Sequence, residues 1–231
     1  MPNLSKRSNE TEIMDNFLLD HDEIDGALDE LEIINTWLGG NKVIINGLKR
    51  LKLNGSVHIA DWGCGGGDML RLLSKWAKKK NISVKLTGID ATHSAVEYAS
   101  AKSVAYPEID IILANVIEET EKIPKCDVVI STLFTHHFDD ESWVQLITNM
   151  FFSARKAVII NDIHRHWLAY QSINLLTGFF SKSTMVKNDA GLSVLRSFKK
   201  SELKDLLNKA GIRNYKIRWM WAFRWQIIIF K

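Results

Sequence analysis

The stretch Val57-His-Ile-Ala-Asp-Trp-Gly-Cys-Gly-Gly-Gly-Asp68 predicts a buried strand, a glycine-rich turn and the start of a helix. Glycine suits turns that need a positive φ or a close approach of the backbone to a ligand. The helix that follows points free backbone N–H groups at the turn, where they can meet a polar ligand. The stretch therefore predicts a cofactor-binding loop.

The spacing of the glycines distinguishes between cofactors. A dinucleotide fingerprint needs Gly-x-Gly-x-x-Gly, but Asp68 stands at the third glycine position when the count starts at Gly63. This spacing argues against a nicotinamide oxidoreductase. An acidic-x-Gly-x-Gly-x-Gly spacing is present instead, and it is formed by Asp61, Gly63, Gly65 and Gly67.

A second mark follows at the end of the next predicted strand. The segment Val84-Lys-Leu-Thr-Gly-Ile-Asp90 ends in a carboxylate at the position where ribose hydroxyls are usually bound. The loop, the strand and Asp90 together resemble motif I and the acidic motif after it in class I S-adenosylmethionine (SAM)-dependent methyltransferases. A purely structural strand–turn–helix is the alternative interpretation, and Asp90 disfavours it.

The composition is that of one globular domain. The chain has 231 residues, of which 46% are hydrophobic, enough to bury a full core. No apolar run approaches the ~20 residues of a membrane span, and the N-terminus has no apolar signal segment, so we expect a cytoplasmic protein with no membrane partner. Cys64 and Cys126 show no metal-binding or redox spacing.

Charge is unevenly distributed along the chain. Residues 1–32 hold ten acidic and two basic side chains, whereas residues 182–231 hold twelve basic and three acidic ones. Two oppositely charged solvated faces, or docking of the acidic N-terminal helix near the basic C-terminal half, would both account for this pattern. The sequence pI of about 8.7 lies below the value of about 9 that suggests nucleic-acid binding, so we expect no nucleic-acid partner.

Alternating helices and strands fill most of the sequence. Residues 1–10 are polar and are expected to be disordered. Helices are expected at 24–38, 43–51, 93–104 and 140–153, and strands at 57–62, 84–90, 109–113, 126–131 and 157–162. This alternation predicts an α/β fold with a doubly wound, mostly parallel sheet and helices on both faces.

The alternation stops after residue 162. Residues 163–198 are predicted to form a lid insertion, with a helix at 167–180 and then a polar stretch. A helix at 200–210 precedes aromatic and aliphatic residues of period two at 215–227, which favour a pair of strands over base stacking. We predict a single domain with an N-terminal helical extension (1–52), a SAM-binding core (53–162), the lid insertion (163–198) and a C-terminal helix and strand pair (199–231).

Over residues 24–231 the chain is similar to class I SAM-dependent methyltransferases. Within them it resembles bacterial small-molecule methyltransferases of the ubiquinone/menaquinone-biosynthesis type that accompany type III polyketide synthases. The segments that carry this closer likeness are residues 28–40, 131–139, 161–165 and 192–198. The resemblance implies a seven-stranded Rossmann-like sheet with an antiparallel C-terminal strand, SAM as cofactor, S-adenosylhomocysteine (SAH) as product and a small-molecule acceptor.

The same resemblance implies a cofactor site. The glycine loop would hold the methionine part of SAM and Asp90 the ribose. Asn115 stands where the superfamily often has an acidic residue, and its amide oxygen can still accept from the adenine amino group. The implied cofactor-binding residues are Asp61, Gly63, Cys64, Gly65, Gly67, Asp90, Ala91, Asn115, Val116, Ser131, Thr132 and Leu133.

Methyl transfer from a sulfonium is an in-line displacement that depends on positioning and on exclusion of water. A neutral phenol also needs a base, and histidine suits this role near neutral pH. His136 and His137 follow the fourth strand at the carboxyl edge of the sheet, where ligands of such folds bind. They are our candidate catalytic residues, and a purely structural role for both is the alternative.

The lid insertion supplies candidate substrate-binding residues. Trp167 and Tyr170 would form an apolar wall for an aromatic acceptor, and Arg165 and Arg196 would either contact it or have structural roles. Asp162, His164 and His166 share one face of an extended chain, but Arg165 interrupts them and nothing completes a metal shell. We therefore expect no metal site.

Several functions fit these residues. The favoured one is an O-methyltransferase acting on a small aromatic or polyketide-like hydroxyl. A C-methyltransferase of a quinone precursor and a non-catalytic SAM-binding module are the alternatives, although the latter has no reason to keep a large lid. A nucleic-acid or protein methyltransferase would need a basic face or a peptide groove. A monomer and a homodimer are both compatible with the sequence.

Overall fold

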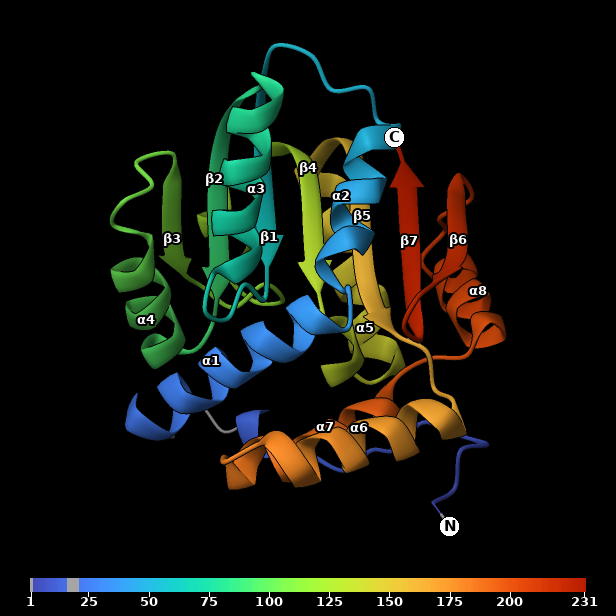
Figure 1. Cartoon of the computed structure of the whole chain (residues 1–231). Coiled ribbons are helices and arrows are strands. Elements are labelled where there is room, and N and C mark those ends of the chain that lie inside the picture. Colours follow the sequence, from blue (N-terminus) through green and yellow to red (C-terminus); the bar gives the residue numbers. More distant parts are fainter. Residues whose placement is uncertain (1, 16–20) are drawn as a thin grey trace.

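A seven-stranded sheet forms the centre of the protein, with strand order β3-β2-β1-β4-β5-β7-β6 (Figure 1). The computed structural model describes residues 2–15 and 21–231. The strands are β1 (Ser56–Trp62), β2 (Ser83–Asp90), β3 (Ile109–Leu113), β4 (Cys126–Thr132), β5 (Ala154–Ile163), β6 (Tyr215–Met220) and β7 (Arg224–Phe230). Strands β1 to β5 pair in parallel, whereas β7 is antiparallel to both β5 and β6. The predicted fold class is confirmed.

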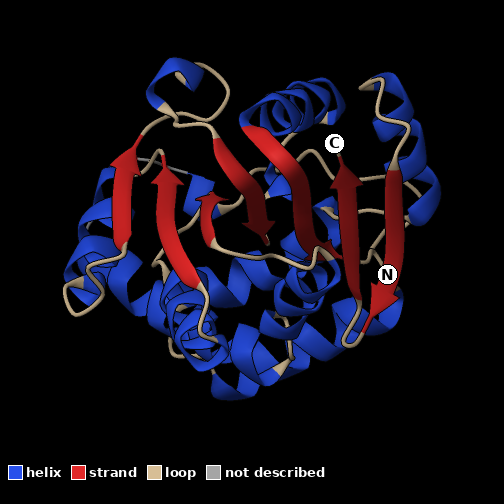
Figure 2. Ribbon diagram, turned by 90° about the horizontal axis from the view of Figure 1, so that it is seen from above, coloured by secondary structure: helices blue, strands red, loops and turns tan. Residues whose placement is uncertain are grey.

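Helices cover both faces of this sheet, as the view in Figure 2 shows. The α-helices are α1 (His21–Trp37), α2 (Asn41–Arg50), α3 (Asp68–Lys80), α4 (His93–Ser103), α5 (Asp140–Ser153), α6 (Trp167–Phe180), α7 (Thr184–Arg196) and α8 (Lys200–Lys209). Figure 1 shows α2 and α3 in front of the sheet and α5 and α8 behind it. None of the described helices is long and apolar enough to cross a membrane.

Two apolar cores lie on opposite faces of the sheet. Successive residues of a strand point to opposite faces, so Ile59 joins the core under α2 and α3, whereas Ala60 joins the core under α5 and α8. Because both faces are covered, the central parallel strands are almost continuously apolar. This is why the sequence pattern located them.

Three helices lie across the carboxyl edge of the parallel strands. In Figure 1, α1, α6 and α7 lie below the ends of β1, β4 and β5, and we call these three helices the lid. Helix α7 occupies a stretch that the sequence predicted only as polar. It begins because the Ser183 side chain accepts a hydrogen bond from Val186 N at 3.3 Å.

The N-terminal residues 2–15, here called the strap, are ordered against the lid, and the prediction of disorder for residues 2–10 is wrong. Arg7 donates from Nε to Arg196 O at 2.8 Å and from Nη2 to Phe138 O at 2.7 Å. Ser8 N donates to Leu195 O at 3.0 Å. These contacts join residues far apart in sequence, so no local pattern indicates them; residue 1 lies outside the described residues.

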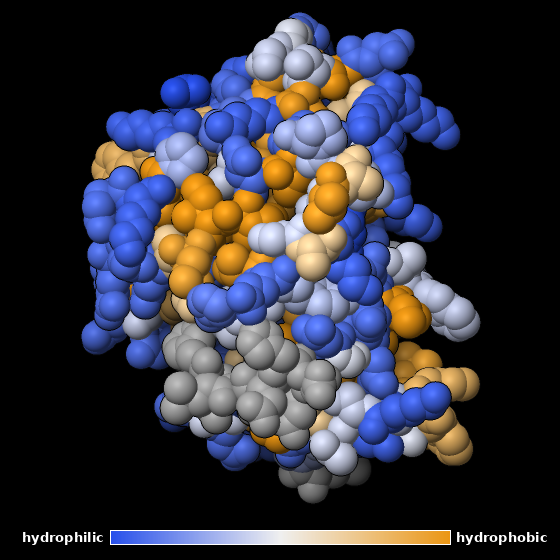
Figure 3. Space-filling model, turned by 90° about the vertical axis from the view of Figure 1, so that its left-hand side faces the viewer, coloured by the Kyte–Doolittle hydropathy of each residue, from blue (hydrophilic) through white to orange (hydrophobic). Residues whose placement is uncertain are grey.

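Hydrophobic side chains gather on the side of the molecule where β3 is the edge strand (Figure 3). Leu113 on β3 and Val104, just after α4, are exposed. Strand β3 spans only five residues. A short edge strand limits unwanted pairing with other chains.

Gly88 on β2 provides a test of the packing behind the cofactor loop. A Cβ at this position would lie 2.7 Å from Leu70 Cδ1 and 2.8 Å from both Cys64 Sγ and Ile111 Cδ1. We expect Gly88→Ala to lower the free energy of unfolding by about 1–3 kcal/mol, because overpacking forces side chains off their rotamers. Urea denaturation measures this change.

The matched control is Gly178→Ala on α6, where an added Cβ would meet no atom within 4 Å. Alanine in a helix is favoured over glycine by about 0.5–1 kcal/mol, so this variant should be at least as stable as the parent. Equal stabilities of the two variants would contradict the close packing around Gly88.

Candidate active site

A cavity of about 540 Å³ lies between the carboxyl edge of the sheet and the lid. Small-molecule sites typically measure ~300–1,000 Å³. Its wall includes the glycine loop, the ends of β2, β4 and β5, the strap and one face of each lid helix. The apolar part of the wall is formed mainly by Ile24, Leu28, Leu31, Ile34, Ile163, Ile173, Leu176, Val186, Trp221 and Phe223.

The cofactor loop, residues 63–67, is held against the end of β2. Gly65 has a φ of +48° and Gly67, the N-cap of α3, a φ of +71°, values that favour glycine. Gly65 N donates to Asp90 Oδ2 at 2.9 Å, and Thr92 N donates to Asp90 Oδ1 at 3.0 Å. Asp90 therefore fixes the loop as well as facing the cavity.

Three carboxyl groups surround this loop. Burial raises the pKa of Asp61, Asp68 and Asp90, and for Asp61 the neighbouring charges of the other two raise its pKa further. Asp61 Oδ1 is buried and has no hydrogen-bond partner among the described residues. Buried carboxyls without a cation are costly when ionised, so this end of the cavity fits a positively charged ligand. The ammonium and sulfonium groups of SAM satisfy that requirement.

Most of the predicted cofactor residues line the cavity. They are Asp61, Gly63, Cys64, Gly65, Asp90, Ala91, Thr132 and Leu133. Gly67, Asn115, Val116 and Ser131 do not. Asn115 Oδ1 accepts from Ile117 N at 2.9 Å, and Ser131 Oγ donates to Trp62 O at 2.9 Å, so both side chains serve the local backbone. The adenine contact implied for Asn115 is not supported by this arrangement.

His136 lies in a short 3-10 helix, Thr135–His137, directly after β4. Its Nδ1 lies 2.7 Å from Asp162 Oδ1 at the end of β5, and its backbone N donates to Asp162 Oδ2 at 3.0 Å. Burial acts to raise the pKa of Asp162, but His136 and a hydrogen bond from Thr135 hold this pKa below its usual value. An ionised Asp162 makes Nδ1 the protonated nitrogen, which leaves the lone pair on Nε2.

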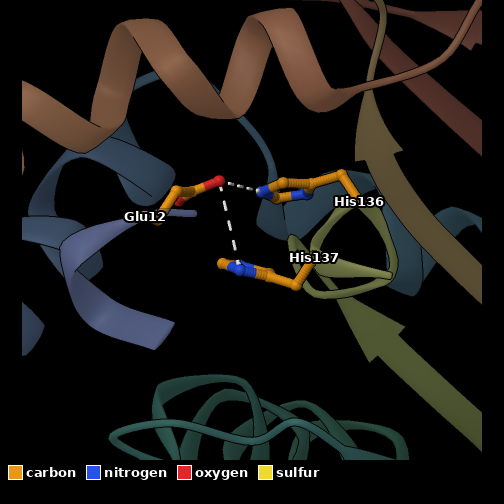
Figure 4. A group of neighbouring side chains, drawn as sticks. All are labelled: Glu12, His136 and His137. Atoms are coloured by element: carbon orange, nitrogen blue, oxygen red, sulfur yellow. Dashed lines mark ion pairs between the residues drawn. The ribbon is translucent and has the colours of Figure 1, made fainter. Parts of the chain in front are cut away.

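The free nitrogen of His136 faces Glu12 of the strap (Figure 4). The distance from His136 Nε2 to Glu12 Oε1 is 3.6 Å, and His137 Nδ1 lies 4.0 Å from the same oxygen. Neither His136 Nε2 nor Glu12 Oε1 has a hydrogen-bond partner among the described residues. Burial raises the pKa of Glu12 to about 6, although His137, Ser193 and Arg196 oppose the shift. The imidazole of His136 thus has a fixed orientation, but its Nε2 has no hydrogen-bond partner among the described residues.

Glu12, His136 and His137 are also close enough to hold a metal ion, since one ligand atom of each lies within 4.8 Å of the others. His137 Nδ1 is already 2.6 Å from Asp15 Oδ1. A metal ion would occupy the one free nitrogen of His136. The absence of a metal site remains a prediction from the sequence. Without a metal ion, Nε2 of His136 is available to a substrate.

The residues predicted to bind substrate lie outside the cavity wall. Arg196 donates from Nη1 to Asp15 Oδ2 at 2.6 Å and to Glu10 O at 3.0 Å. Arg165 donates to Leu4 O at 3.2 Å and to Ser197 O and Glu202. Both guanidinium groups hold the strap and the lid, so the structure gives them structural roles.

Helix α6 does line the cavity, but with a different face from the one predicted. Ala169, Ile173 and Leu176 face inward, at the spacing of one helical face. Trp167 is 57% exposed, and Tyr170 is not part of the wall. The prediction located the right helix but not its buried side.

Further polar residues line the cavity that the sequence did not single out. They are Glu12, Asp15, Glu32, Asn35, Asp68, Thr92, Ser172, Asp189, Ser193 and Arg224. The excess of acidic residues at the N-terminus was a partial signal for Glu12 and Asp15. The sequence around Arg224 contains no pattern that distinguishes it from the other basic residues of the C-terminal half.

Comparison with known proteins agrees with this geometry. Residues 59–156, from β1 to the start of β5, match the protein family described as "Methyltransferase domain". No curated protein sequence matches the chain. Together with the seven-stranded fold, this match, which covers less than half of the chain, agrees with a class I methyltransferase architecture and with SAM as the cofactor.

Solved structures share this fold at low sequence identity. Human N-acetylserotonin methyltransferase in complex with SAM is 13% identical with a TM-score of 0.66, and the alignment covers 92% of this chain but 56% of the human one. The plantazolicin methyltransferase BpumL with SAH is 19% identical (TM-score 0.64; 93% and 92% covered). A SAM-dependent methyltransferase from Aquifex aeolicus is 16% identical (TM-score 0.60; 91% and 98% covered). This chain thus spans little more than half the length of the human enzyme.

Asp90→Ala tests the cofactor site. Hydrogen bonds to charged groups contribute about 1.5–3 kcal/mol, and the substitution also releases Gly65 N, so the affinity for SAH should fall at least tenfold. Isothermal titration calorimetry measures this affinity. Asp110→Ala is the matched control, because Asp110 lies on β3 outside the cavity and pairs with Lys85 at 3.5 Å. Equal affinities of the two variants would refute the assignment of Asp90.

Proposed function

We propose that this protein is an O-methyltransferase that transfers the methyl group of SAM to the hydroxyl of a small aromatic or polyketide-like compound. The observation that carries the proposal is the oriented pair of Asp162 and His136: Nε2 of His136 has no hydrogen-bond partner among the described residues, and His136 forms part of the wall of the cavity that also contains the cofactor loop. The likeness to methyltransferases that accompany type III polyketide synthases supports a polyketide-like acceptor.

SAM supplies an electrophilic methyl group on a sulfonium. The protein's own residues have to place the acceptor oxygen in line with it, remove the proton and exclude water. Asp162 fixes the tautomer and orientation of His136, and Nε2 can then take the proton from the acceptor hydroxyl. The lid and the strap cover the cavity and limit the access of water.

The shape of the wall supports an aromatic or otherwise apolar acceptor. Apolar side chains from all three lid helices face the cavity, including Leu31 of α1, Ile173 of α6 and Val186 of α7. Trp221 and Phe223 add aromatic surface from the turn between β6 and β7. Such a wall binds flat apolar bodies, while the few polar groups orient them.

Two alternative functions predict different products. A C-methyltransferase of a quinone precursor would use the same base to form a carbanion-like carbon nucleophile, and its product would keep its free hydroxyls. A non-catalytic SAM-binding module would bind SAH but turn over no acceptor. With orcinol as test acceptor, mass spectrometry separates methylation from no product, and proton NMR of the product separates a methyl ether from its isomer, the ring-methylated product.

His136→Ala tests the proposed base. General-base catalysis contributes about 10²–10⁴-fold, so kcat for ether formation should fall by this factor while the affinity for SAH is retained. His93→Ala is the control, since His93 is exposed and pairs with Glu97 on α4 at 3.5 Å. His137→Ala removes the contact with Asp15, and we expect it to affect stability more than rate. Equal small losses in the His136 and His137 variants would show that the acceptor ionises without a base.

Hydrogen exchange tests the lid. Leu28 of α1 lies over the cofactor loop, since a Cβ added to Gly65 would be 3.5 Å from Leu28 Cδ2. Because α1 covers this loop, SAH alone should slow exchange in α1. Helices α6 and α7 contact the acceptor side of the cavity and should slow further only with SAH and orcinol together. Identical exchange of all three helices in the free and the ternary states would rule out a lid.

A further inference from the structure

Arg224 is a buried arginine at the start of β7 that faces the cavity. It pairs in register with Ile163 at the end of β5, its residue is 4% exposed, and it forms part of the cavity wall. Its Nη1 is buried without a hydrogen-bond partner among the described residues. Burial lowers the pKa of Arg224 to about 10, and the charge of Asp162 only partly opposes this shift.

The other buried arginines of the described chain are all paired. Arg71 donates to Gly66 O at 2.6 Å and to Glu32 at 2.8 Å. Arg165 binds Glu202 and carbonyls of the strap, and Arg196 binds Asp15 and further carbonyls. Buried charges are normally paired and hydrogen-bonded in this way. Arg224 is the exception, and its partner has to come from outside the described chain.

Asp162 forms no hydrogen bond with the guanidinium of Arg224 among the described residues. Its two carboxylate oxygens already accept from Thr135 Oγ1, from the backbone and ring of His136, and from Ile163 N. No salt bridge joins Asp162 to Arg224 within the described residues, although its charge is felt there. The guanidinium therefore keeps donors free for a ligand in the cavity.

The cofactor is a poor candidate for that ligand. Its loop follows β1, whereas Arg224 begins β7, and β4 and β5 lie between them. At a strand spacing of about 4.8 Å, three steps place the two sites roughly 14 Å apart along the sheet edge. The carboxyl groups at the β1–β2 end attract cations. An anionic group near Arg224 thus belongs to the acceptor.

We propose that Arg224 binds a carboxylate of the methyl acceptor, which makes the acceptor class an aromatic hydroxy acid. This inference rests on the proposed function, because it assigns a group on the acceptor of that reaction. The planar guanidinium matches a carboxylate with two parallel hydrogen bonds. Trp221 and Phe223 line the wall beside it and can contact the aromatic ring.

The same geometry orients the acceptor. His136 binds Asp162 directly, and Arg224 feels the charge of the same carboxylate, so both groups lie around the end of β5. A carboxylate held by Arg224 fixes one end of the aromatic ring. The hydroxyl then has a defined position relative to Nε2 of His136, and Arg224 acts as a residue that selects and positions the acceptor.

The test compares two probes that differ by one carboxylate, orsellinate and orcinol. Calorimetry with the full chain and saturating SAH measures the binding of each. We expect the wild type to bind orsellinate at least ~10-fold more tightly than orcinol, because charge-assisted bidentate hydrogen bonds are the strong ones. Arg224→Met should abolish the preference by lowering the affinity for orsellinate to that for orcinol. Arg224→Lys keeps the positive charge but loses the two parallel donors of the guanidinium, so it should retain part of the preference for orsellinate.

Thermal unfolding separates a binding role from a structural one. Replacing an unpaired buried charge by an apolar side chain of similar size should leave the Tm of Arg224→Met equal to or above that of the wild type. Arg165→Met is the matched control, because Arg165 is buried and fully partnered. We expect its Tm to fall.

The inference is overturned if the wild type shows no preference for orsellinate, whether or not orcinol binds. It is also overturned if Arg224→Met and Arg224→Lys keep the full preference, or if Arg224→Met lowers the Tm as Arg165→Met does and binds both probes as the wild type does. Binding in the presence of SAH needs no methyl transfer. A preserved preference with no ether product would therefore refute the proposed reaction and not the assignment of Arg224.

Discussion

The buried carboxylate of Asp162 is the interaction on which the acceptor side of the site depends. It lies at the end of β5 with no exposed surface and accepts hydrogen bonds from Thr135 and His136. These bonds join the end of β5 to the turn after β4, fix the ring of His136 and leave its Nε2 without a hydrogen-bond partner among the described residues. A parallel sheet brings the carboxyl ends of its strands to one edge, and Asp162 converts this proximity into a defined side-chain geometry.

Covering that edge requires polar contacts between distant segments. The strap has few apolar residues, and arginines hold it in place instead: Arg7 and Arg196 donate to backbone carbonyls across the strap, the turn after β4 and α7. Glu30 of α1 accepts from Lys182 N at 2.8 Å and so joins α1 to the start of α7. Asp15 of the strap and Arg196 of α7 also form an ion pair at 2.6 Å, so an acidic and a basic side chain from the two ends of the chain meet there.

The sequence predicted the sheet and the cofactor loop because both depend on local patterns. Glycine spacing, buried apolar runs and the terminal Asp90 are each visible within a few residues. The acceptor side depends on contacts over long sequence distances, so the strap and Glu12 gave no comparable signal. In the sequence, charge and position indicate Arg165 and Arg196 as substrate contacts. Only the structure shows that their donors are used, whereas Nη1 of Arg224 has no partner among the described residues.

The two ends of the cavity differ in charge, and this difference has a consequence for turnover in the proposed reaction. Asp61, Asp68 and Asp90 surround the cofactor end, whereas Arg224 lies at the other. Transfer of the methyl group converts a sulfonium into a neutral thioether, so the attraction of these carboxylates for the cofactor weakens once the reaction is complete. In the proposed reaction we therefore expect the acidic end to attract SAM more strongly than SAH. Asp61 contributes most clearly to this difference, because no group of the described chain satisfies its buried oxygen.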